Sequence, residues 1–313
     1  MRLAALALVM IGLAGPALAG GFPDKGDPGD ATRRTLDTPD GRRQYLVQPV
    51  PGKASAPIVL LLHGGTQEAR QVWKQTSFAT LARRDGFILV APSGIDNRWN
   101  DGRGATIAPG GPSSADDIGF LLAVIDDVVK RDGGNPKAVF MAGVSNGGFM
   151  TMSFACSGRF ALAGGANIIS DLPVRAVEGC KSAPTPWLSL NGTSDPVIPY
   201  AGQGPGIVRR GEEQPALLSA DDTFQFFAAR AGCSTEVFRD RLPDLDPRDG
   251  SWVERKTHPC ANGRSSVQYV VHNGGHATPG LDLGPVLTRM LGGINMDIDT
   301  GSVVWSFFKD QLR

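Results

Sequence analysis

Short, mostly apolar runs recur along the chain and predict strands that are buried on both faces of a sheet. They contain few charged residues and are bounded by polar, Gly or Pro residues. Runs of this length are typical of a parallel sheet that helices cover on both sides. The runs are residues 57–62, 87–91, 138–142, 186–190 and 267–271.

Between these runs, apolar residues recur with the period of an α-helix. Residues 118–130 place their large aliphatic side chains on one face, and residues 223–231 follow a capping box at 219–222. A last helical pattern covers 302–312. Alternating strands and helices predict the α/β class, with a mostly parallel central sheet flanked by helices on both faces, in one domain over 38–313.

The first residues of the chain are typical of a secretory signal peptide. Arg2 precedes an apolar run over 3–13, and an A-x-A cleavage pattern ends at Ala19. The alternative, an N-terminal membrane anchor, needs about 20 apolar residues. We therefore expect export to the periplasm or the medium, no membrane contact after cleavage, and a monomer. Residues 20–37 are rich in Gly, Asp and Pro and are expected to form a flexible leader.

The charge balance argues against a nucleic acid partner. The chain has 31 basic and 31 acidic side chains, and its formal net charge is zero. Long runs of like charge, the usual electrostatic feature of nucleic acid binding, are missing from the sequence. A neutral or only locally charged small molecule, oligomer or polymer is the more natural substrate.

Four cysteines, Cys156, Cys180, Cys233 and Cys260, predict two disulfides in an exported chain. Four cysteines permit three pairings, of which the sequential one closes the shortest loops. The spacings C-x-x-C and H-x-x-H do not occur, so no metal site is expected.

A G-x-S-x-G motif makes Ser145 the candidate nucleophile. The motif directly follows the predicted strand 138–142 and precedes a run that is compatible with a helix. A sharp strand-to-helix turn exposes the serine at a helix N-terminus, where backbone N–H groups favour developing negative charge. The alternative is a serine that only caps the helix. We expect catalysis in this context.

A serine hydroxyl needs a base, and four histidines are available: His63, His258, His272 and His276. The chain order Ser, acid, His of α/β-hydrolases excludes the first of them. The sequence HNGGH follows the strand 267–271, and its second histidine lies on a Gly-Gly turn that can lean over the serine. We therefore predict His276 as the base, with His272 as the alternative.

The acid is expected after the next-to-last strand. Asp195 ends a short turn after residues 186–190, where its carboxylate can accept the imidazole N–H. An ordinary turn before Pro196 is the alternative explanation. Asp171 and Asp222 are rival acids, but one follows an earlier strand and the other belongs to the capping box.

The oxyanion hole is predicted to use the N–H groups of Gly65 and Asn146. Asn146 follows the nucleophile, and Gly65 lies in the loop after the strand 57–62, where glycines allow a close backbone approach. His63 is expected to shape this loop. Trp99 and Thr66 are the predicted substrate-binding residues.

Irregular stretches at 101–115, 196–218 and 238–266 are further candidates for substrate contact. In doubly wound sheets, such loops build the site at the carboxyl ends of the strands.

Taken together, the motifs resemble those of secreted polyhydroxybutyrate-depolymerase-like and feruloyl-esterase-like α/β-hydrolases. The motifs are LLHGGTQ, WNDGR, DDIGFL, GVSNGG, NGTSDPVIPY, GGHATPG and DIDTGSVVWSFF. They occur in the family's order over nearly all of the chain after the predicted signal peptide. The resemblance implies the same catalytic residues and oxyanion donors, the sequential disulfides, and ester hydrolysis without a cofactor. One position departs from the family, because Thr278 stands where a Trp is frequent, so we expect an altered acyl-binding surface.

The sequence therefore predicts a secreted serine esterase that acts on a hydroxyalkanoate, feruloyl or acetyl ester. A peptidase or thioesterase with the same catalytic residues is an alternative. A second alternative is a non-catalytic homologue that binds a polysaccharide or a surface.

Overall fold

A computed structural model describes residues 22–27, 29, 31–104, 113–209 and 211–312. The predicted signal peptide and residues 105–112 of the first candidate loop lie outside the described residues.

A ten-stranded sheet forms the centre of the molecule, in the order β1-β2-β4-β3-β5-β6-β7-β12-β11-β10. Neighbouring strands from β4 to β12 run parallel, whereas the strands at both ends of the sheet pair antiparallel. The strands are β1 (Thr32–Thr38), β2 (Gly41–Gln48), β3 (Ala56–Leu62), β4 (Ile88–Pro92), β5 (Gly134–Val144), β6 (Gly164–Ile168), β7 (Trp187–Gly192), β10 (Phe238–Arg241), β11 (Trp252–Pro259) and β12 (Ser265–His272), and a separate hairpin consists of β8 (Val208–Arg209) and β9 (Glu212–Glu213).

Every strand predicted from an apolar run is present, as β3, β4, β5, β7 and β12, so the predicted parallel sheet is confirmed. The central strand β6 was not predicted, because its sequence GGANI contains only one large apolar residue, Ile168. The reason is steric: a Cβ atom on Gly165 would lie 2.1 Å from the ring of Trp187. The indole of Trp187 on the neighbouring strand β7 therefore occupies the volume that a side chain at position 165 of β6 would need.

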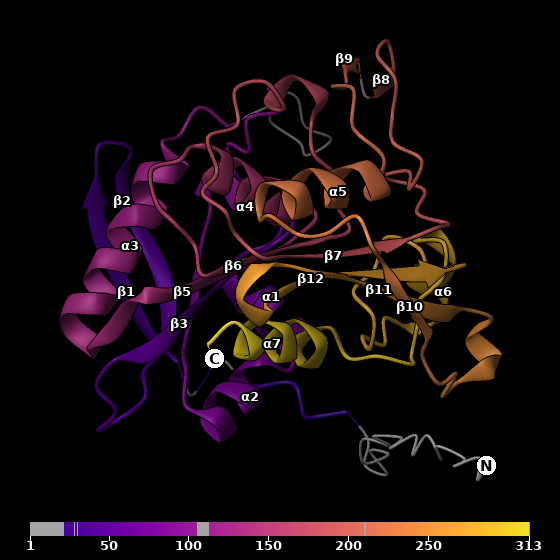
Figure 1. Cartoon of the computed structure of the whole chain (residues 1–313). Helices are drawn as coiled ribbons and strands as arrows, with labels where there is room; N and C mark the ends of the chain where they lie inside the picture. Colours follow the sequence, from indigo (N-terminus) through magenta and orange to yellow (C-terminus); the bar gives the residue numbers. More distant parts are fainter. Residues whose placement is uncertain (1–21, 28, 30, 105–112, 210, 313) are drawn as a thin grey trace, which may run out of the picture.

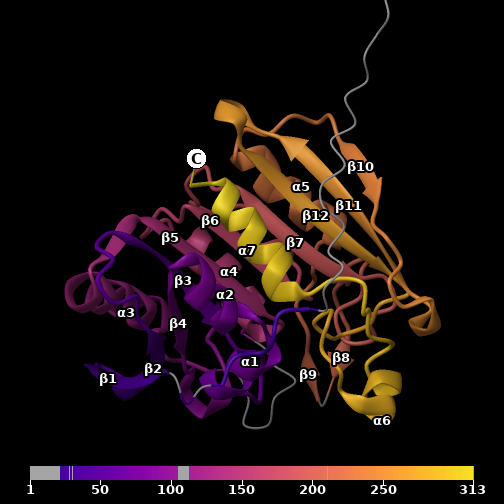
Figure 2. The same ribbon diagram turned by 90° about the horizontal axis from the view of Figure 1, so that it is seen from below.

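Helices cover both faces of the sheet (Figure 1). One face carries α3 (Asp117–Asp132), α4 (Asn146–Cys156) and α5 (Ala220–Arg230), and the other carries α1 (Ala69–Gln75), α2 (Phe78–Asp85) and α7 (Thr300–Asp310). A short helix, α6 (Gly284–Met290), lies apart from the sheet (Figure 2). The helices predicted at 118–130, 223–231 and 302–312 correspond to α3, α5 and α7.

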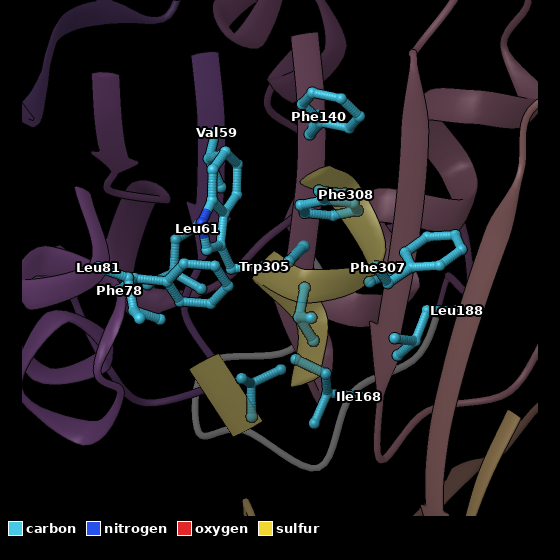
Figure 3. Packing of buried hydrophobic residues seen from close by; sticks show 14 of the residues in the cluster. Val59, Leu61, Phe78, Leu81, Phe140, Ile168, Leu188, Trp305, Phe307 and Phe308 are labelled. Atoms are coloured by element: carbon cyan, nitrogen blue, oxygen red, sulfur yellow. The ribbon is translucent and has the colours of Figure 1, made fainter. Parts of the chain in front are cut away.

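Alternate residues of the central strands point to opposite faces of the sheet and belong to two separate hydrophobic cores. In β3, Val59 and Leu61 pack with α7, whereas Ile58 and Leu60 pack with α3 and α4. Figure 3 shows Trp305, Phe307 and Phe308 of α7 beside Phe140 and the strand residues of the first core. Burial on both faces explains why these strands read as continuous apolar runs.

The N-terminal segment is partly built into the fold, which corrects the prediction of a flexible leader over 20–37. Residues 32–37 belong to β1, which pairs with β2 from Thr32 to Thr38. Upstream, the Lys25 ammonium donates hydrogen bonds to the backbone oxygens of Gln75 (3.3 Å) and Gly280 (2.6 Å). The charged residues of β1 give it the composition of a leader, but its position as an edge strand tolerates them.

Both disulfides have the sequential pairing, Cys156–Cys180 and Cys233–Cys260. Within the described residues, no helix combines the length and apolar character that a bilayer span requires.

Candidate active site

Ser145 lies at the sharp turn between β5 and α4. Its φ of 52° and ψ of −115° belong to a region that side-chain-bearing residues rarely adopt. A backbone hydrogen bond from Ser145 N to Ile168 O, 2.8 Å long, ties the turn to β6. The conformation raises the hydroxyl above the carboxyl end of the sheet, as the G-x-S-x-G motif predicts.

The glycine of the motif that follows the serine is required for steric reasons. A Cβ atom on Gly147 would lie 2.5 Å from Leu62 O and 2.6 Å from His63 O. The first turn of α4 therefore packs directly against the end of β3. This close approach brings the loop after β3 next to Ser145.

The imidazole of His276 bridges the serine and an aspartate. Its Nε2 atom lies 3.0 Å from Ser145 Oγ, and its Nδ1 atom lies 2.7 Å from Asp195 Oδ2. With the proton on Nδ1, the ring donates to the carboxylate and accepts the serine O–H. The sequence-predicted residues 145, 195 and 276 are thus in hydrogen-bond contact, although they come from three distant segments.

Backbone groups hold both partners of this pair. The other oxygen of Asp195, Oδ1, accepts the N–H groups of Val197 at 2.7 Å and Ile198 at 2.8 Å. The backbone N–H of His276 donates to Leu291 O at 2.6 Å. The carboxylate side chain is only 2% exposed and the imidazole 12%. Burial and fixed donors leave the imidazole little freedom to turn away from Ser145.

The alternative histidines have other partners. His272 stacks on Trp252 with ring centroids 3.7 Å apart, and its Nε2 lies 3.6 Å from Glu254. His258 contacts Ser234 O through Nδ1 at 3.0 Å, near the opposite end of the sheet. Neither is placed beside Ser145.

Of the rival acids, Asp171 is fully buried and Asp222 belongs to the cap of α5. Asp171 accepts a hydrogen bond from Asn191 at 3.1 Å. Burial, reinforced by the negative charge of Asp195, raises its pKa well above the ordinary range. Ser219 Oγ accepts the N–H of Asp222 in the predicted capping box. Neither carboxylate contacts His276, and Asp171 favours the neutral form.

Gly65 and Asn146, the predicted oxyanion donors, are neighbours. A Cβ atom on Gly65 would lie 3.6 Å from the Cβ of Asn146. Asn146 is the first residue of α4, where a backbone N–H has no acceptor within the helix. Two backbone N–H groups on neighbouring segments suit an oxyanion, and their use as donors stays a prediction.

The side chain of Asn146 is anchored by the WNDGR segment. Its Oδ1 accepts the Trp99 N–H at 2.8 Å, and its Nδ2 donates to Asp101 at 2.5 Å. Asp101 pairs in turn with buried Arg103 at 2.7 Å, whose guanidinium lies 3.8 Å from the ring centre of Phe149. The roles of Asp101 and Arg103 were not predicted, although the motif WNDGR contains both residues.

Trp99 does not contact the pocket beside Ser145, which corrects its prediction as a substrate-binding residue. Its side chain is 3% exposed, and the indole N–H donates to His63 O at 2.9 Å. Trp99 therefore supports the loop after β3 from behind.

His63 shapes this loop, as predicted. Its Nδ1 donates to Gly64 O at 2.8 Å, and its Nε2 accepts the N–H of Gly94 at 2.9 Å. Burial, with a smaller effect of the Arg43 charge, lowers the pKa of His63 to about 4 against the opposing hydrogen bond to Gly64. The imidazole is therefore neutral at physiological pH.

A pocket of about 190 Å³ opens beside Ser145 and His276. Apart from His276, the lining residues in the described part of the chain have no ionisable side chain. The remaining lining residues are Gly64, Gly65, Gln67, Gln75, Val144, Ile169, Ala277, Thr278, Leu281, Leu283 and Leu291. A pocket of this kind favours a neutral substrate.

The pocket differs from the predicted substrate contacts in several ways. The loops predicted at 101–115, 196–218 and 238–266 contribute no lining residue among the described ones, and 238–266 contains the strands β10 and β11. Thr66 is exposed between the lining residues 65 and 67, so its contact with substrate stays a prediction. Thr278 lines the pocket, and its buried Oγ1 has no hydrogen-bond partner. Three leucines that were not predicted form part of the pocket wall: Leu281, Leu283 and Leu291.

The described residues contain no group of three or more His, Cys, Asp or Glu side chains that could hold a metal ion. The site itself offers a hydroxyl, an imidazole and a carboxylate in hydrogen-bond contact.

Curated relatives are named as esterases. NocK of Nocardia uniformis subsp. tsuyamanensis, which is named as an esterase, is 27% identical over 290 residues, covering 88% of this chain and 82% of that protein. Feruloyl esterase B of Piromyces equi is 29% identical over 72% of this chain and 40% of that enzyme. Poly(3-hydroxyalkanoate) depolymerase C of Paucimonas lemoignei is 26% identical over 72% of this chain and 56% of that enzyme. The chain thus spans less than two thirds of the length of the latter two. No family model matches the chain.

Solved structures confirm the fold. An acetyl xylan esterase from Aspergillus awamori superposes with a TM-score of 0.55 at 14% identity, covering 89% of this chain and 99% of that chain. A thermostable esterase gives a TM-score of 0.50 at 16% identity over 66% of this chain and 53% of that chain. The protein has the α/β-hydrolase fold. The names of the curated relatives agree with the resemblance seen in the motifs and with the predicted class, a carboxylic ester hydrolase.

Proposed function

We propose that this chain is an exported serine esterase in which Ser145 is the nucleophile, His276 the general base and Asp195 the residue that orients the base. The observation that carries the proposal is the continuous contact from Ser145 Oγ through His276 to Asp195, at 3.0 and 2.7 Å, beside an uncharged pocket. The paired disulfides support export, since such bonds persist in oxidising compartments.

In the first half-reaction, His276 Nε2 takes the proton of Ser145 as its oxygen attacks the ester carbonyl. The carbonyl oxygen becomes an oxyanion between the N–H groups of Gly65 and Asn146, and each such donor is worth roughly 3 kcal/mol in comparable sites. The C–O bond to the alcohol then breaks, and the alcohol leaves with the proton from His276. The acyl group stays on Ser145.

In the second half-reaction, a water molecule loses a proton to His276 and attacks the acyl-enzyme. Collapse of this second oxyanion returns the proton to Ser145 and releases the acid. The Asp195 carboxylate stabilises the imidazolium by accepting its Nδ1–H. The buried Asp195 carboxylate is suited to this role because Val197 and Ile198 already satisfy its other oxygen.

For the substrate class, relatives named as a poly(3-hydroxyalkanoate) depolymerase, a feruloyl esterase and an acetylxylan esterase favour esters of hydroxyalkanoic, ferulic or acetic acid. A neutral ester of this kind suits a pocket without ionisable side chains other than His276. A catalytically silent binding protein is disfavoured, because such proteins usually lose one of the three catalytic side chains, and all three are in contact here.

The proposal is tested by turnover of p-nitrophenyl acetate by the protein and by Ser145→Ala. We expect the variant to keep the far-ultraviolet circular dichroism of the parent and to lose activity by about 10³-fold or more. Wild-type activity in Ser145→Ala would exclude this serine as the nucleophile. A matched thioester and anilide in the same assay distinguish an esterase from a thioesterase or a peptidase.

A further inference from the structure

Lys25, in the segment before β1, lies where three parts of the fold meet. Its ammonium group donates hydrogen bonds to Gln75 O at 3.3 Å and to Gly280 O at 2.6 Å. The same nitrogen lies 3.8 Å from Asp299 Oδ1, on a carboxylate side chain that is 1% exposed. An ammonium group has three N–H donors, and three protein oxygens surround this one. The Lys25 side chain is only 26% exposed, although lysine is ordinarily a surface residue.

Two of these three parts line the pocket beside Ser145. Gln75, the last residue of α1, is one of the lining residues. Gly280 belongs to residues 277–283, which directly follow His276 and which we call the wall segment. The lining residues of the wall segment are Ala277, Thr278, Leu281 and Leu283. The ammonium group of Lys25 therefore joins two parts of the pocket lining that are far apart in the sequence.

Further hydrogen bonds tie the wall segment to the C-terminal part of the chain. Pro279 O accepts the backbone N–H of Thr300 at 3.3 Å and its hydroxyl at 2.9 Å, and the N–H of Gly280 donates to Asn295 O at 2.9 Å. None of these three bonds reaches α1. The bonds of Lys25 to Gln75 and Gly280 make that connection, so they hold the wall segment at a fixed place relative to the end of α1.

The backbone next to Lys25 is fixed by a close packing contact. Gly26 is buried, and a Cβ atom there would lie 2.1 Å from the Cβ of Ala79 in α2. The segment can approach the helix this closely only because residue 26 has no side chain. Lys25 is therefore held at its backbone as well as at its ammonium group, unlike a lysine on a solvated surface.

We propose that Lys25 is a positioning residue for ester hydrolysis, which sets the shape of the pocket beside Ser145 by joining the end of α1 to the wall segment. This inference rests on the proposed function. Lys25 is not one of the lining residues, so it acts on the substrate through Gln75 and the wall segment. A displaced wall loses contacts with the acyl chain of the ester in the bound state and in the transition state alike. Such a loss raises KM and leaves kcat nearly unchanged.

The test compares Lys25→Met with the parent on dissolved p-nitrophenyl acetate and p-nitrophenyl butyrate. Methionine keeps an unbranched side chain of similar length but donates no hydrogen bond. On the butyrate we expect kcat/KM to fall by about fivefold or more through a higher KM, with kcat changed by less than about twofold. On the acetate, kcat/KM should fall by less than about twofold, because a methyl group reaches fewer lining residues than a propyl group. Lys25→Arg restores a charged donor and should recover part of the butyrate activity.

The matched control is Lys53→Met. Lys53 Nζ also donates to a backbone oxygen at 2.6 Å, that of Gly86, but neither of these residues lines the pocket. The control should match the parent on both esters. A second variant, Gly26→Ala, keeps the ammonium group but forces the backbone beside it away from Ala79. It should show the same selective loss on the butyrate, and it repeats the comparison if Lys25→Met misfolds.

Other outcomes would overturn the inference. Equal losses on the two esters, or a lower melting temperature with unchanged kcat and KM, would leave Lys25 with a structural role only. A lower kcat with an unchanged KM would mean that Lys25 acts on the catalytic residues rather than on the wall segment. Failure of the parent on both esters would instead count against the proposed function, whereas an active parent that Lys25→Met matches on both esters would exclude this inference alone.

Discussion

At the scale of single residues, the site depends on two residues whose backbone conformations are intrinsically unfavourable. Ser145 has a φ of 52°, and Thr66 in the facing loop has a φ of 65°. Both are held by backbone hydrogen bonds, from Ser145 N to Ile168 O and from Thr66 N to Asn97 O, each 2.8 Å long. Such strain persists only where surrounding structure fixes it. It places the hydroxyl and the Gly64-Gly65 backbone on the same side of the sheet edge.

His63 makes a pH-dependent contribution to stability through the loop it supports. Burial lowers its pKa to about 4 from an ordinary 6.5, so the unfolded chain binds a proton in a pH range where the folded protein does not. The stabilising effect is fully present above pH 6.5 and is lost as the pH falls toward 4, by up to about 3 kcal/mol. We expect His63→Gln to have a lower free energy of unfolding than the parent at neutral pH. As the pH falls from 7 to 4, that free energy should decline less steeply in the variant.

The measurement is urea denaturation of both proteins at intervals between pH 7 and pH 4. Other groups titrate in both chains, so the quantity of interest is the difference between the two free energies of unfolding. A difference that stays constant over this range would contradict a buried neutral imidazole.

The residue types of the site could be predicted from sequence because their chemistry leaves few choices. The G-x-S-x-G context singles out Ser145, and the Gly-Gly turn after a strand favours His276 over His272. The prediction for Trp99 was wrong because the sequence does not distinguish a tryptophan that faces a substrate from one that packs beneath a loop. Trp99 packs beneath the loop after β3. Only the hydrogen bond of its indole to His63 O distinguishes the two.

At the scale of elements, the segment WNDGR connects the loop after β3 to α4, whose first residue is the proposed oxyanion donor Asn146. Buried Asp101 joins Asn146 Nδ2 to Arg103, and both side chains of the ion pair are under 10% exposed. Asp101→Ala should lower the free energy of unfolding by about 3 kcal/mol, because it leaves a buried guanidinium unpaired. It should also lower kcat by roughly tenfold or more, because the position of Asn146 is no longer fixed.

Adding Arg103→Met to Asp101→Ala provides the control. The double variant should recover part of the stability, since the uncompensated charge is gone, but not the lost kcat. Urea denaturation and p-nitrophenyl acetate kinetics measure the two effects. If the double variant loses as much stability as the two single variants together, Asp101 and Arg103 do not stabilise each other.

Helices and strands with a clear pattern of apolar residues could be predicted from the sequence. Elements whose sequence depends on their neighbours in the fold could not. β3 and residues 138–144 of β5 are apolar because both faces of the sheet are covered there. β6 is rich in glycine, since Trp187 occupies the space above Gly165. α6 has no buried face and therefore no amphipathic pattern that the sequence could reveal, so the pocket wall next to it was missed.

At the scale of the whole molecule, the two disulfides close loops of similar length. Cys156 ends α4 and pairs with Cys180 across 24 residues, whereas Cys233 and Cys260 are 27 residues apart. Replacing either pair with alanine should lower the free energy of unfolding by about 3 kcal/mol, because the unfolded chain gains entropy. Neither pair contacts the catalytic residues, so activity at low temperature should survive.

The two double variants, each compared with the parent by chemical denaturation, are controls for each other. A loss confined to one pair would mean that local packing rather than loop closure dominates. Unchanged stability in both would contradict the paired state of the cysteines.

The central claim is that Ser145 is activated by His276, and site-specific labelling tests it most directly. The native protein is treated with a fluorophosphonate, and the modified peptide is identified by mass spectrometry. We predict one adduct, on Ser145, whose rate of formation falls steeply in His276→Ala and whose signal disappears in Ser145→Ala. A label on another residue, or equal labelling rates in the parent and His276→Ala, would contradict the account.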